Sequence, residues 1–146
     1  MQKRVREILS KKGAVVHSVT PTTSVADAVR RMNEAGVGAV LVMMREEVVG
    51  ILSERDVLVR VVDALRDPLA TSVEEVMSTR LVTIGPDAMV QEGMRVMTEK
   101  RVRHLPVMEA RQLMGIISIG DLTKAVVEDL QEEVVQLETY IAGPRF

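Results

Sequence analysis

Hydrophobic residues follow the same succession of spacings twice along the chain. Each succession contains a stretch in which every third or fourth residue is hydrophobic, and this spacing predicts an amphipathic helix. Two short, almost wholly hydrophobic runs follow, separated by charged residues, which favours a hairpin of two buried strands. A Ser then begins a second helix, and a short hydrophobic run ahead of the first helix predicts one more strand. In the first half we expect a strand around 15–19, a helix between Ser24 and Gly36, strands at 39–43 and 48–52, and a helix from Ser53.

The second half predicts the same elements but ends in a longer helix. We expect a strand around 81–84, a helix at 87–100, strands at 104–108 and 113–117, and a helix from Ser118 to about Thr139. Four hydrophobic residues of the last helix form a line at spacings of three and four: Leu130, Val134, Leu137 and Ile141. Because an exposed line of this kind favours association, we expect it to pack on a partner subunit or back onto the module.

The two halves are copies of one another. Gly50 aligned on Gly115 gives an offset of 65 residues, and this offset holds without a gap over about forty residues. Further upstream, residues 5–10 resemble residues 73–78 at an offset of 68. The chain is therefore a tandem duplication with a joint near Asp67 and Pro68.

This duplication predicts the domain organisation and the fold class. We expect a first unit at 1–67, a second unit at 68–128, and a C-terminal helix and tail at 129–146. Each unit is β-α-β-β-α, a mixed α/β (α+β) arrangement, and neither unit has enough residues for a stable core of its own. We therefore expect the two units to pack sheet to sheet about a pseudo-two-fold axis.

The composition argues against several classes of function. The chain of 146 residues is 47% hydrophobic, has a net charge of -2 and contains no cysteine, so disulfides and thiolate zinc sites are excluded. Tyr140 and Phe146 are the only Tyr, Phe or Trp residues, and the net charge is slightly acidic. We therefore do not expect binding to nucleic acid or to a membrane. No catalytic triad, phosphate-binding loop or metal-ligand set is present in the sequence. We expect a cytoplasmic protein that is not an enzyme.

One motif, Gly-h-h-Ser-x-x-Asp with h hydrophobic, stands at equivalent places in the two repeats. Its copies are Gly50–Asp56 and Gly115–Asp121, each at the end of a predicted buried strand. A duplicated β-α-β-β-α unit with this motif resembles the cystathionine-β-synthase-type (CBS) domain, and the pair resembles a stand-alone bacterial CBS pair, or Bateman module. The resemblance covers the chain from about Val5 to about Glu128. It implies a homodimer that associates through helices and signals to an effector protein.

The resemblance also implies a regulatory ligand and the residues that bind it. The expected ligand is an adenosyl nucleotide (AMP, ADP, ATP, NAD(P)(H) or S-adenosylmethionine), bound in clefts between the two units, and no cofactor is required. The aspartates Asp56 and Asp121 would accept hydrogen bonds from ribose hydroxyls, and Ser53 and Ser118 would contact ribose or phosphate. A carboxylate can accept both hydrogens of a cis-diol, and a Ser-capped helix start offers free N–H groups to a phosphate, so the chemistry is consistent. The complete set is Val16, Gly38, Ala39, Ser53, Arg55 and Asp56 from the first repeat, and Val82, Thr83, Ile84, Arg103, His104, Pro106, Ile116, Ser118 and Asp121 from the second.

The two sites are expected to differ. Arg103 and His104 would face phosphate in the second repeat, whereas the first repeat has Gly38 and Ala39 at those positions, with Arg55 as a substitute cation. We therefore expect the second site to suit charged nucleotides, and the first to take a larger or less anionic ligand or none.

Three alternatives stay open at this stage. The Ser-x-x-Asp motif is also a helix capping box, which needs no ligand. His104 can instead be a half-buried residue bonded to backbone, and the chain can be a structural homodimer with vestigial clefts. His17, Lys11 and Lys12 are interpreted as solvated and uninvolved.

Overall fold

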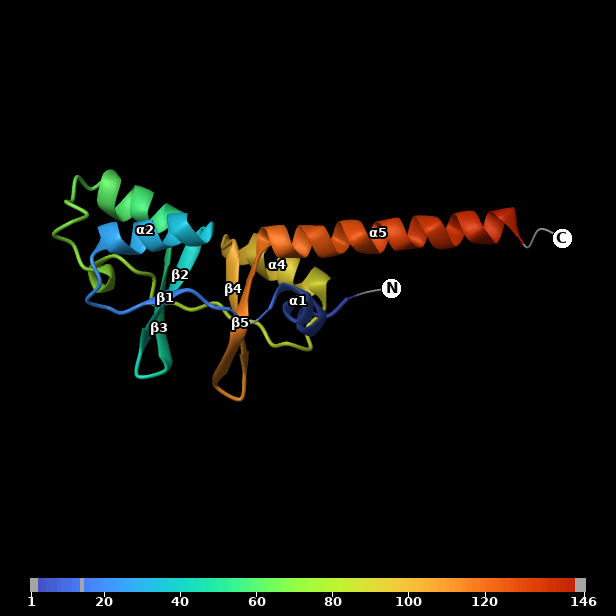
Figure 1. The fold of residues 1–146 in the computed structure, drawn as a ribbon, viewed down its shortest axis with the longest axis horizontal. Helices are drawn as coiled ribbons and strands as arrows, with labels where there is room; N and C mark the ends of the chain where they lie inside the picture. The colour runs from blue at the N-terminus through green and yellow to red at the C-terminus, as the bar shows by residue number, and fades with distance from the viewer. Residues whose placement is uncertain (1–2, 14, 144–146) are drawn as a thin grey trace. The chain divides into compact units, whose positions relative to one another are not determined.

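The structure is a computed structural model, and it describes residues 3–13 and 15–143. Contacts divide the chain into two compact units, each drawn with its helices and strands in Figure 1. The first-repeat unit holds residues 15–81, and the second-repeat unit combines residues 3–13 with residues 82–143. The end of the predicted C-terminal extension, residues 144–146 with Phe146, lies outside the described residues.

The first-repeat unit is a three-stranded sheet with helices. β1 pairs in parallel with β2, and β2 pairs antiparallel with β3, as the hairpin pattern predicted. Ser24 caps the first helix through a bond from the Asp27 N–H to its Oγ (3.1 Å), and Gly36 ends it in a left-handed conformation. In chain order the elements are β1 (Ser18–Val19), α2 (Val25–Ala35), β2 (Ala39–Met44), β3 (Glu47–Ser53), α3 (Glu54–Val57), a π-helical stretch (Leu58–Val62) and a 3-10 turn (Val73–Glu75).

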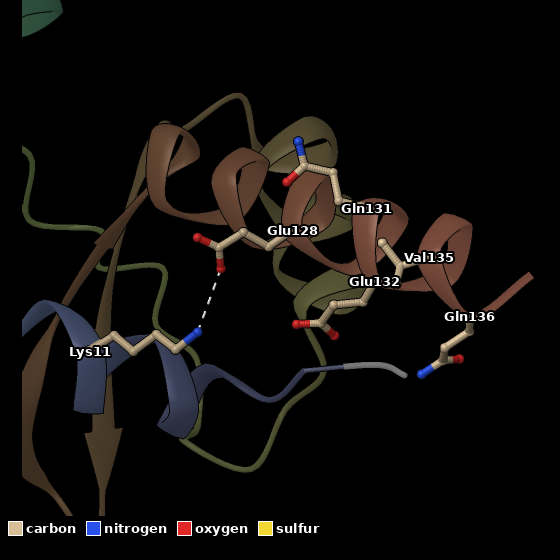
Figure 2. Close-up of a pocket in the computed structure, with 6 residues that line it drawn as sticks. All are labelled: Lys11, Glu128, Gln131, Glu132, Val135 and Gln136. Carbon is tan, nitrogen blue, oxygen red and sulfur yellow. Dashed lines mark ion pairs between the residues drawn. The ribbon is translucent and has the colours of Figure 1, made fainter. Parts of the chain in front are cut away.

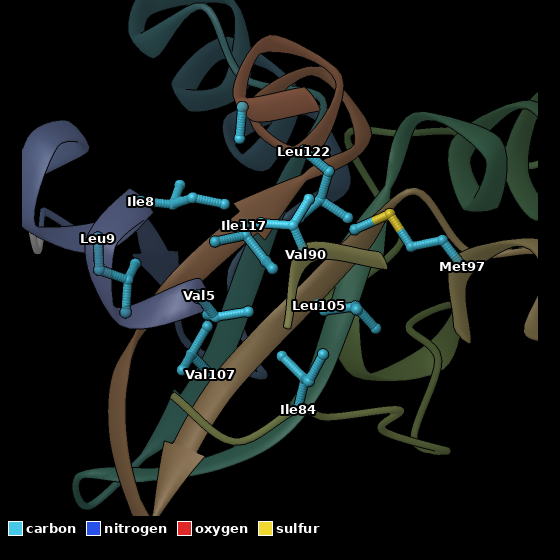
Figure 3. Close-up of a cluster of buried hydrophobic side chains, with 11 residues drawn as sticks. Val5, Ile8, Leu9, Ile84, Val90, Met97, Leu105, Val107, Ile117 and Leu122 are labelled. Atoms are coloured by element: carbon cyan, nitrogen blue, oxygen red, sulfur yellow. The ribbon is translucent and has the colours of Figure 1, made fainter. Parts of the chain in front are cut away.

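The second-repeat unit is built on the β4–β5 hairpin. β4 and β5 pair antiparallel with the same register as β2 and β3, including one irregularity at the equivalent place. Its core gathers residues from helices and strands far apart in the sequence, such as Val5, Leu105, Ile117 and Leu122, all fully buried (Figure 3). The elements are α1 (Val5–Lys12), α4 (Val90–Lys100), β4 (His104–Glu109), β5 (Gln112–Ser118) and α5 (Ile119–Ala142).

The compact units do not follow the predicted joint at 67 and 68, because the segments that precede the two repeats are exchanged. Val5 on α1 donates its backbone N–H to Ala88 (2.9 Å) and buries its side chain in the second-repeat core. In the reciprocal exchange, Val73 donates its N–H to Thr23 (2.8 Å) and is buried in the first-repeat core. Residues 3–13 and 68–81 are thus part of the opposite unit from the one we expected.

This exchange explains why each motif begins with glycine. A Cβ on Gly50 would lie 2.5 Å from Met77 Sδ and 3.0 Å from the Ser78 carbonyl oxygen. A Cβ on Gly115 would lie 2.8 Å from a methyl group of Leu9. In both repeats the exchanged segment passes so close to the strand that a Cβ at this position would require a neighbouring group to shift.

Two predicted elements of the second repeat differ from the structure. The predicted strand at 81–84 is a single parallel bridge between Ile84 and Val107, since only Ile84 exchanges backbone bonds with β4. The helix predicted from residue 87 begins at Val90 instead. The residues ahead of Val90 bond instead to the backbone of the first segment: Pro86 accepts the Arg6 N–H (2.8 Å), and the Val90 N–H donates to Lys3 (3.0 Å).

α5 is longer than the helix predicted to end near Thr139, with 24 residues up to Ala142. Leu122, Ala125 and Asp129 are buried, whereas every residue from 131 to 143 is exposed, and Figure 1 shows this end reaching past α1 and α4. The predicted line of hydrophobic residues lies on the exposed part. Leu130, Val134, Leu137 and Ile141 are 55, 52, 60 and 81% exposed, respectively.

Candidate functional site

The first motif forms a capping box at the start of α3. The Asp56 N–H donates to Ser53 Oγ (3.2 Å), while Asp56 Oδ2 accepts from the Ser53 N–H (2.9 Å) and from its hydroxyl (3.1 Å). Asp56 Oδ1 accepts a further bond from the hydroxyl of Ser78 (3.0 Å), which lies on the exchanged segment. The donors around this carboxylate are therefore all uncharged.

The second motif forms the same capping box at the start of α5, but its carboxylate has a different partner on the exchanged segment. Asp121 donates its N–H to Ser118 Oγ (3.2 Å), and its Oδ2 accepts from the Ser118 N–H (2.8 Å). The ammonium of Lys12, at the end of α1, donates to Asp121 Oδ2 (2.7 Å) and to the Ile116 carbonyl oxygen (2.9 Å). Among the described residues, the bonds to the Asp121 carboxylate all end on Oδ2.

The surroundings of Asp121, Lys12 among them, shift the pKa of its carboxyl. Burial acts to raise the pKa of the Asp121 carboxyl, but the bonds from Lys12 and from the Ser118 N–H outweigh it and hold that pKa below its usual value. Asp121 is consequently a stable carboxylate, which is the form that accepts hydrogen bonds from a diol.

Lys12 corrects our interpretation of this residue as solvated and uninvolved. Sequence order placed it ahead of the first repeat, and only the exchange of α1 into the second-repeat unit brings it to Asp121. The repeat offset of 68 aligns Ser10 with Ser78, yet the Ser10 hydroxyl bonds to the Arg6 carbonyl oxygen within α1 (3.1 Å). No signal in the sequence alone indicated that a lysine would replace the serine at the second carboxylate.

The remaining second-repeat candidates gather where β4 begins and β5 ends. His104 is half-buried and pairs in register with Ser118, and the Arg103 carbonyl oxygen accepts the Ile119 N–H (2.9 Å). Pro106 pairs with Ile116 one step further along the hairpin. Thr83 and Arg103 are exposed, Val82 and Ile116 are half-buried, and Ile84 and Pro106 are buried. Ile84 belongs to the core, so most of its side chain is unavailable to a ligand.

The first-repeat candidates occupy the equivalent end of the β2–β3 hairpin. The Gly38 carbonyl oxygen accepts the Glu54 N–H (3.0 Å), and Ala39 pairs in register with Ser53. Val16 is half-buried two residues ahead of β1, and Arg55 is exposed on α3. Each unit thus brings its own candidates together at one hairpin end, with more cationic groups in the second-repeat unit.

A groove of about 450 Å³ lies elsewhere on the second-repeat unit, and the sequence did not predict it. Figure 2 shows it between α1 and α5, with the Lys11 ammonium 3.6 Å from the Glu128 carboxylate. Lys3 also donates to Glu128 (2.9 Å), and this bond lowers the pKa of the Glu128 carboxyl. The lining residues are Lys11, Glu128, Gln131, Glu132, Val135 and Gln136. With Val135 as its one hydrophobic residue, the groove does not suit an adenine ring.

Neither a metal-binding cluster nor a membrane-spanning helix occurs in the described part of the chain. Among residues 3–13 and 15–143, no three His, Asp or Glu side chains are grouped so that they could hold a metal ion. Within the same residues, no helix has both the length and the hydrophobicity needed to cross a membrane.

Comparison with known proteins agrees with the repeat and its motifs. The CBS domain family model matches residues 5–63 and 73–128. The mitochondrial CBS domain-containing protein CBSX3 of Arabidopsis thaliana is 36% identical over 129 residues, which are 85% of this chain and 63% of that protein. This chain therefore spans less than two thirds of that relative.

Solved structures give the same result. A putative signal-transduction protein with CBS domains from Burkholderia ambifaria has a TM-score of 0.84 and 41% identity, covering 87% of this chain and 96% of that one. A hexameric CBS-CP12 protein from bloom-forming cyanobacteria has a TM-score of 0.75 and 29% identity, covering 84% and 67%. CBS pairs are generally regulatory or signal-transduction modules rather than catalytic ones. The chain, with two matched repeats and two copies of the motif, belongs to the CBS domain family.

Proposed function

We propose that this chain is a regulatory module that binds an adenosyl nucleotide at the Ser-x-x-Asp end of each unit and transmits occupancy to a partner protein. The observation that carries the proposal is the state of Asp121. The pKa of its carboxyl is held below the usual value, and its side chain is 24% exposed. Among the described residues, the Ser118 N–H and Lys12 both donate to Oδ2, which leaves Oδ1 to accept a ribose hydroxyl.

The charges around the two motifs support different ligands. The cations Arg103 and Lys12 and the hydrogen-bonding His104 belong to the second-repeat unit, which favours AMP, ADP, ATP or NAD(P)(H), because these ligands carry phosphates. The first motif has Arg55 and otherwise uncharged donors, which favours a less anionic adenosyl ligand such as S-adenosylmethionine.

Self-association is part of the proposal. Leu58, Val59 and Val62 are 62, 54 and 59% exposed on the first-repeat unit, in addition to the hydrophobic line on α5. The cyanobacterial relative is described as hexameric, which supports assembly of this chain into at least a homodimer. The second candidate function is a structural homodimer whose sites are vestigial, and the capping boxes favour it because they satisfy both motifs without ligand.

A thermal-shift panel separates the two functions. A ligand that binds only the folded protein raises its melting temperature by mass action. We expect at least one of AMP, ADP, ATP, NAD(H), NADP(H) and S-adenosylmethionine to do so, and the shift to be lost or reduced in Asp121→Asn or Asp56→Asn. Each aspartate variant is the matched control for the other. No shift with any of these ligands, and no absorbance at 260 nm released from the purified protein, would support the vestigial homodimer instead.

A further inference from the structure

Lys12 occupies the carboxylate that the proposed function assigns to ribose. Its ammonium donates to Asp121 Oδ2 (2.7 Å) and to the Ile116 carbonyl oxygen (2.9 Å), and the two side chains of the ion pair are 34 and 24% exposed. A ligand that brings sugar hydroxyls to Asp121 therefore meets a charge-assisted bond that is already formed.

The first motif has no such group. Within the described part of the chain, the Asp56 carboxylate accepts from Ser53 and Ser78, which are both uncharged donors. The exchanged segments thus place different groups on the two carboxylates, the neutral Ser78 hydroxyl at Asp56 and the Lys12 ammonium at Asp121.

We propose that Lys12 determines the specificity of the second-repeat site, so that the site accepts phosphate-bearing nucleotides and rejects neutral nucleosides. This inference rests on the proposed function. Adenosine has no anion. A ribose cis-diol that donates to both carboxylate oxygens of Asp121 would take Oδ2 from Lys12, and adenosine would leave that ammonium without a counter-ion.

A nucleotide supplies the missing charge. The Lys12 ammonium can donate to its phosphate while the Asp121 carboxylate accepts from its ribose hydroxyls, so one ion pair is exchanged for another. The long, flexible lysine side chain permits this movement without displacement of α1. Arg103, exposed on the same unit at the start of β4, adds a second cation for the phosphate. The first-repeat site has no equivalent exchange and should bind adenosine about as well as its phosphorylated forms.

The test is a calorimetric comparison of adenosine and ADP in the Asp56→Asn background, where only the second-repeat site is titrated. We expect ADP to bind more tightly than adenosine, and Lys12→Met to reduce that preference by about 10-fold or more, with adenosine gaining affinity. Lys12→Arg keeps the cation and should retain the preference. Lys11→Met is the matched control, because it removes the same charge from the adjacent residue, which pairs with Glu128 instead (3.6 Å).

Each result decides the inference. Suppose that Lys12→Met leaves the preference for ADP over adenosine unchanged, and that adding Asp121→Asn still abolishes binding. The role of Lys12 would then be overturned, and the proposed function would stand. If neither adenosine nor ADP binds the unmodified protein, both the inference and the proposed function are refuted. A second readout needs no ligand: NMR titration should show a higher pKa for Asp121 in Lys12→Met than in Lys11→Met. Equal values would show that the ion pair is not formed in solution and would also overturn the inference.

Discussion

At the scale of single residues, the motif Ser-x-x-Asp serves two purposes in this protein. Its Ser and Asp satisfy backbone N–H groups at the start of a helix, and the same carboxylate presents an acceptor at the surface of the unit. Removing the carboxylate therefore affects stability as well as binding. Binding measurements on aspartate variants need an independent measurement of folding for this reason.

The ionisation of Asp121 makes stability depend on acid pH in a defined direction. Because the folded protein holds the pKa of Asp121 below its usual value, the unfolded chain takes up a proton first as the pH falls. The stabilisation is complete above the unfolded pKa of about 4 and is lost as the pH falls through the folded pKa. In urea titrations, we expect the unmodified protein to be more stable than Asp121→Asn at pH 6, with the difference shrinking towards pH 3. A difference that stays constant over this range would contradict the assignment.

The two motif glycines should tolerate a methyl group unequally. In Gly50→Ala the new Cβ meets the Ser78 backbone as well as Met77, and backbone cannot move aside easily. In Gly115→Ala it meets only the terminal methyls of Leu9, which can rotate. We expect Gly50→Ala to cost about 1–3 kcal/mol of the free energy of unfolding and Gly115→Ala clearly less. Equal losses in urea denaturation would argue against close approach of the exchanged segment at Gly50.

At the scale of secondary-structure elements, the exposed end of α5 needs an explanation for its stability. A helical segment of about a dozen residues is marginal in water without packing, and residues 131–142 are exposed throughout. The hydrophobic line from Leu130 to Ile141 gives this segment one face that a partner subunit can cover.

Substitutions on that line test whether α5 contributes to self-association. We expect Leu137→Asp to weaken the homodimer, because it places a charge within the hydrophobic face. Gln136→Asp introduces the same charge at the adjacent residue, off the line, and is the matched control. Truncation after Asp129 should weaken the dimer without unfolding the chain. If sedimentation gives all three variants the dimer affinity of the unmodified protein, α5 is excluded from the interface.

Local patterns predicted most elements correctly, and the errors fall where tertiary contacts decide. Both hairpins, the Ser24 cap and the Gly36 stop have short-range signals, and the structure confirms them. Asp87 resembles a helix start, but residues 86–90 bond to the backbone of the distant segment 3–6, and the helix begins at Val90. Lys12 was misjudged for the same reason, since its partner Asp121 is more than a hundred residues away.

At the scale of the whole molecule, exchange of the flanking segments makes the repeats interdependent. Val5 precedes the first repeat but is buried in the second-repeat core, and Val73 precedes the second repeat but is buried in the first-repeat core. A unit cut out at the predicted joint would lose part of its own core. Duplication alone therefore does not produce two independent domains.

Amide hydrogen exchange can detect directly which unit each flanking segment stabilises. Val5→Ala removes fully buried methyl groups and should cost roughly 2 kcal/mol. The lost protection should appear first in β4 and β5 and not in β2 and β3. Val73→Ala should show the opposite pattern. If each variant instead loses protection first in the repeat that follows it in sequence, the exchanged arrangement is wrong.

The central claim is that the two motifs are ligand sites of unequal chemistry, and calorimetric titration of ATP tests it most directly. We expect binding to the unmodified protein and a loss of about 10-fold or more in affinity in Asp121→Asn. Asp56→Asn should leave this binding event intact, and circular dichroism should show that both variants are folded. Absence of binding heat from the folded protein, or equal loss in the two aspartate variants, would contradict the account.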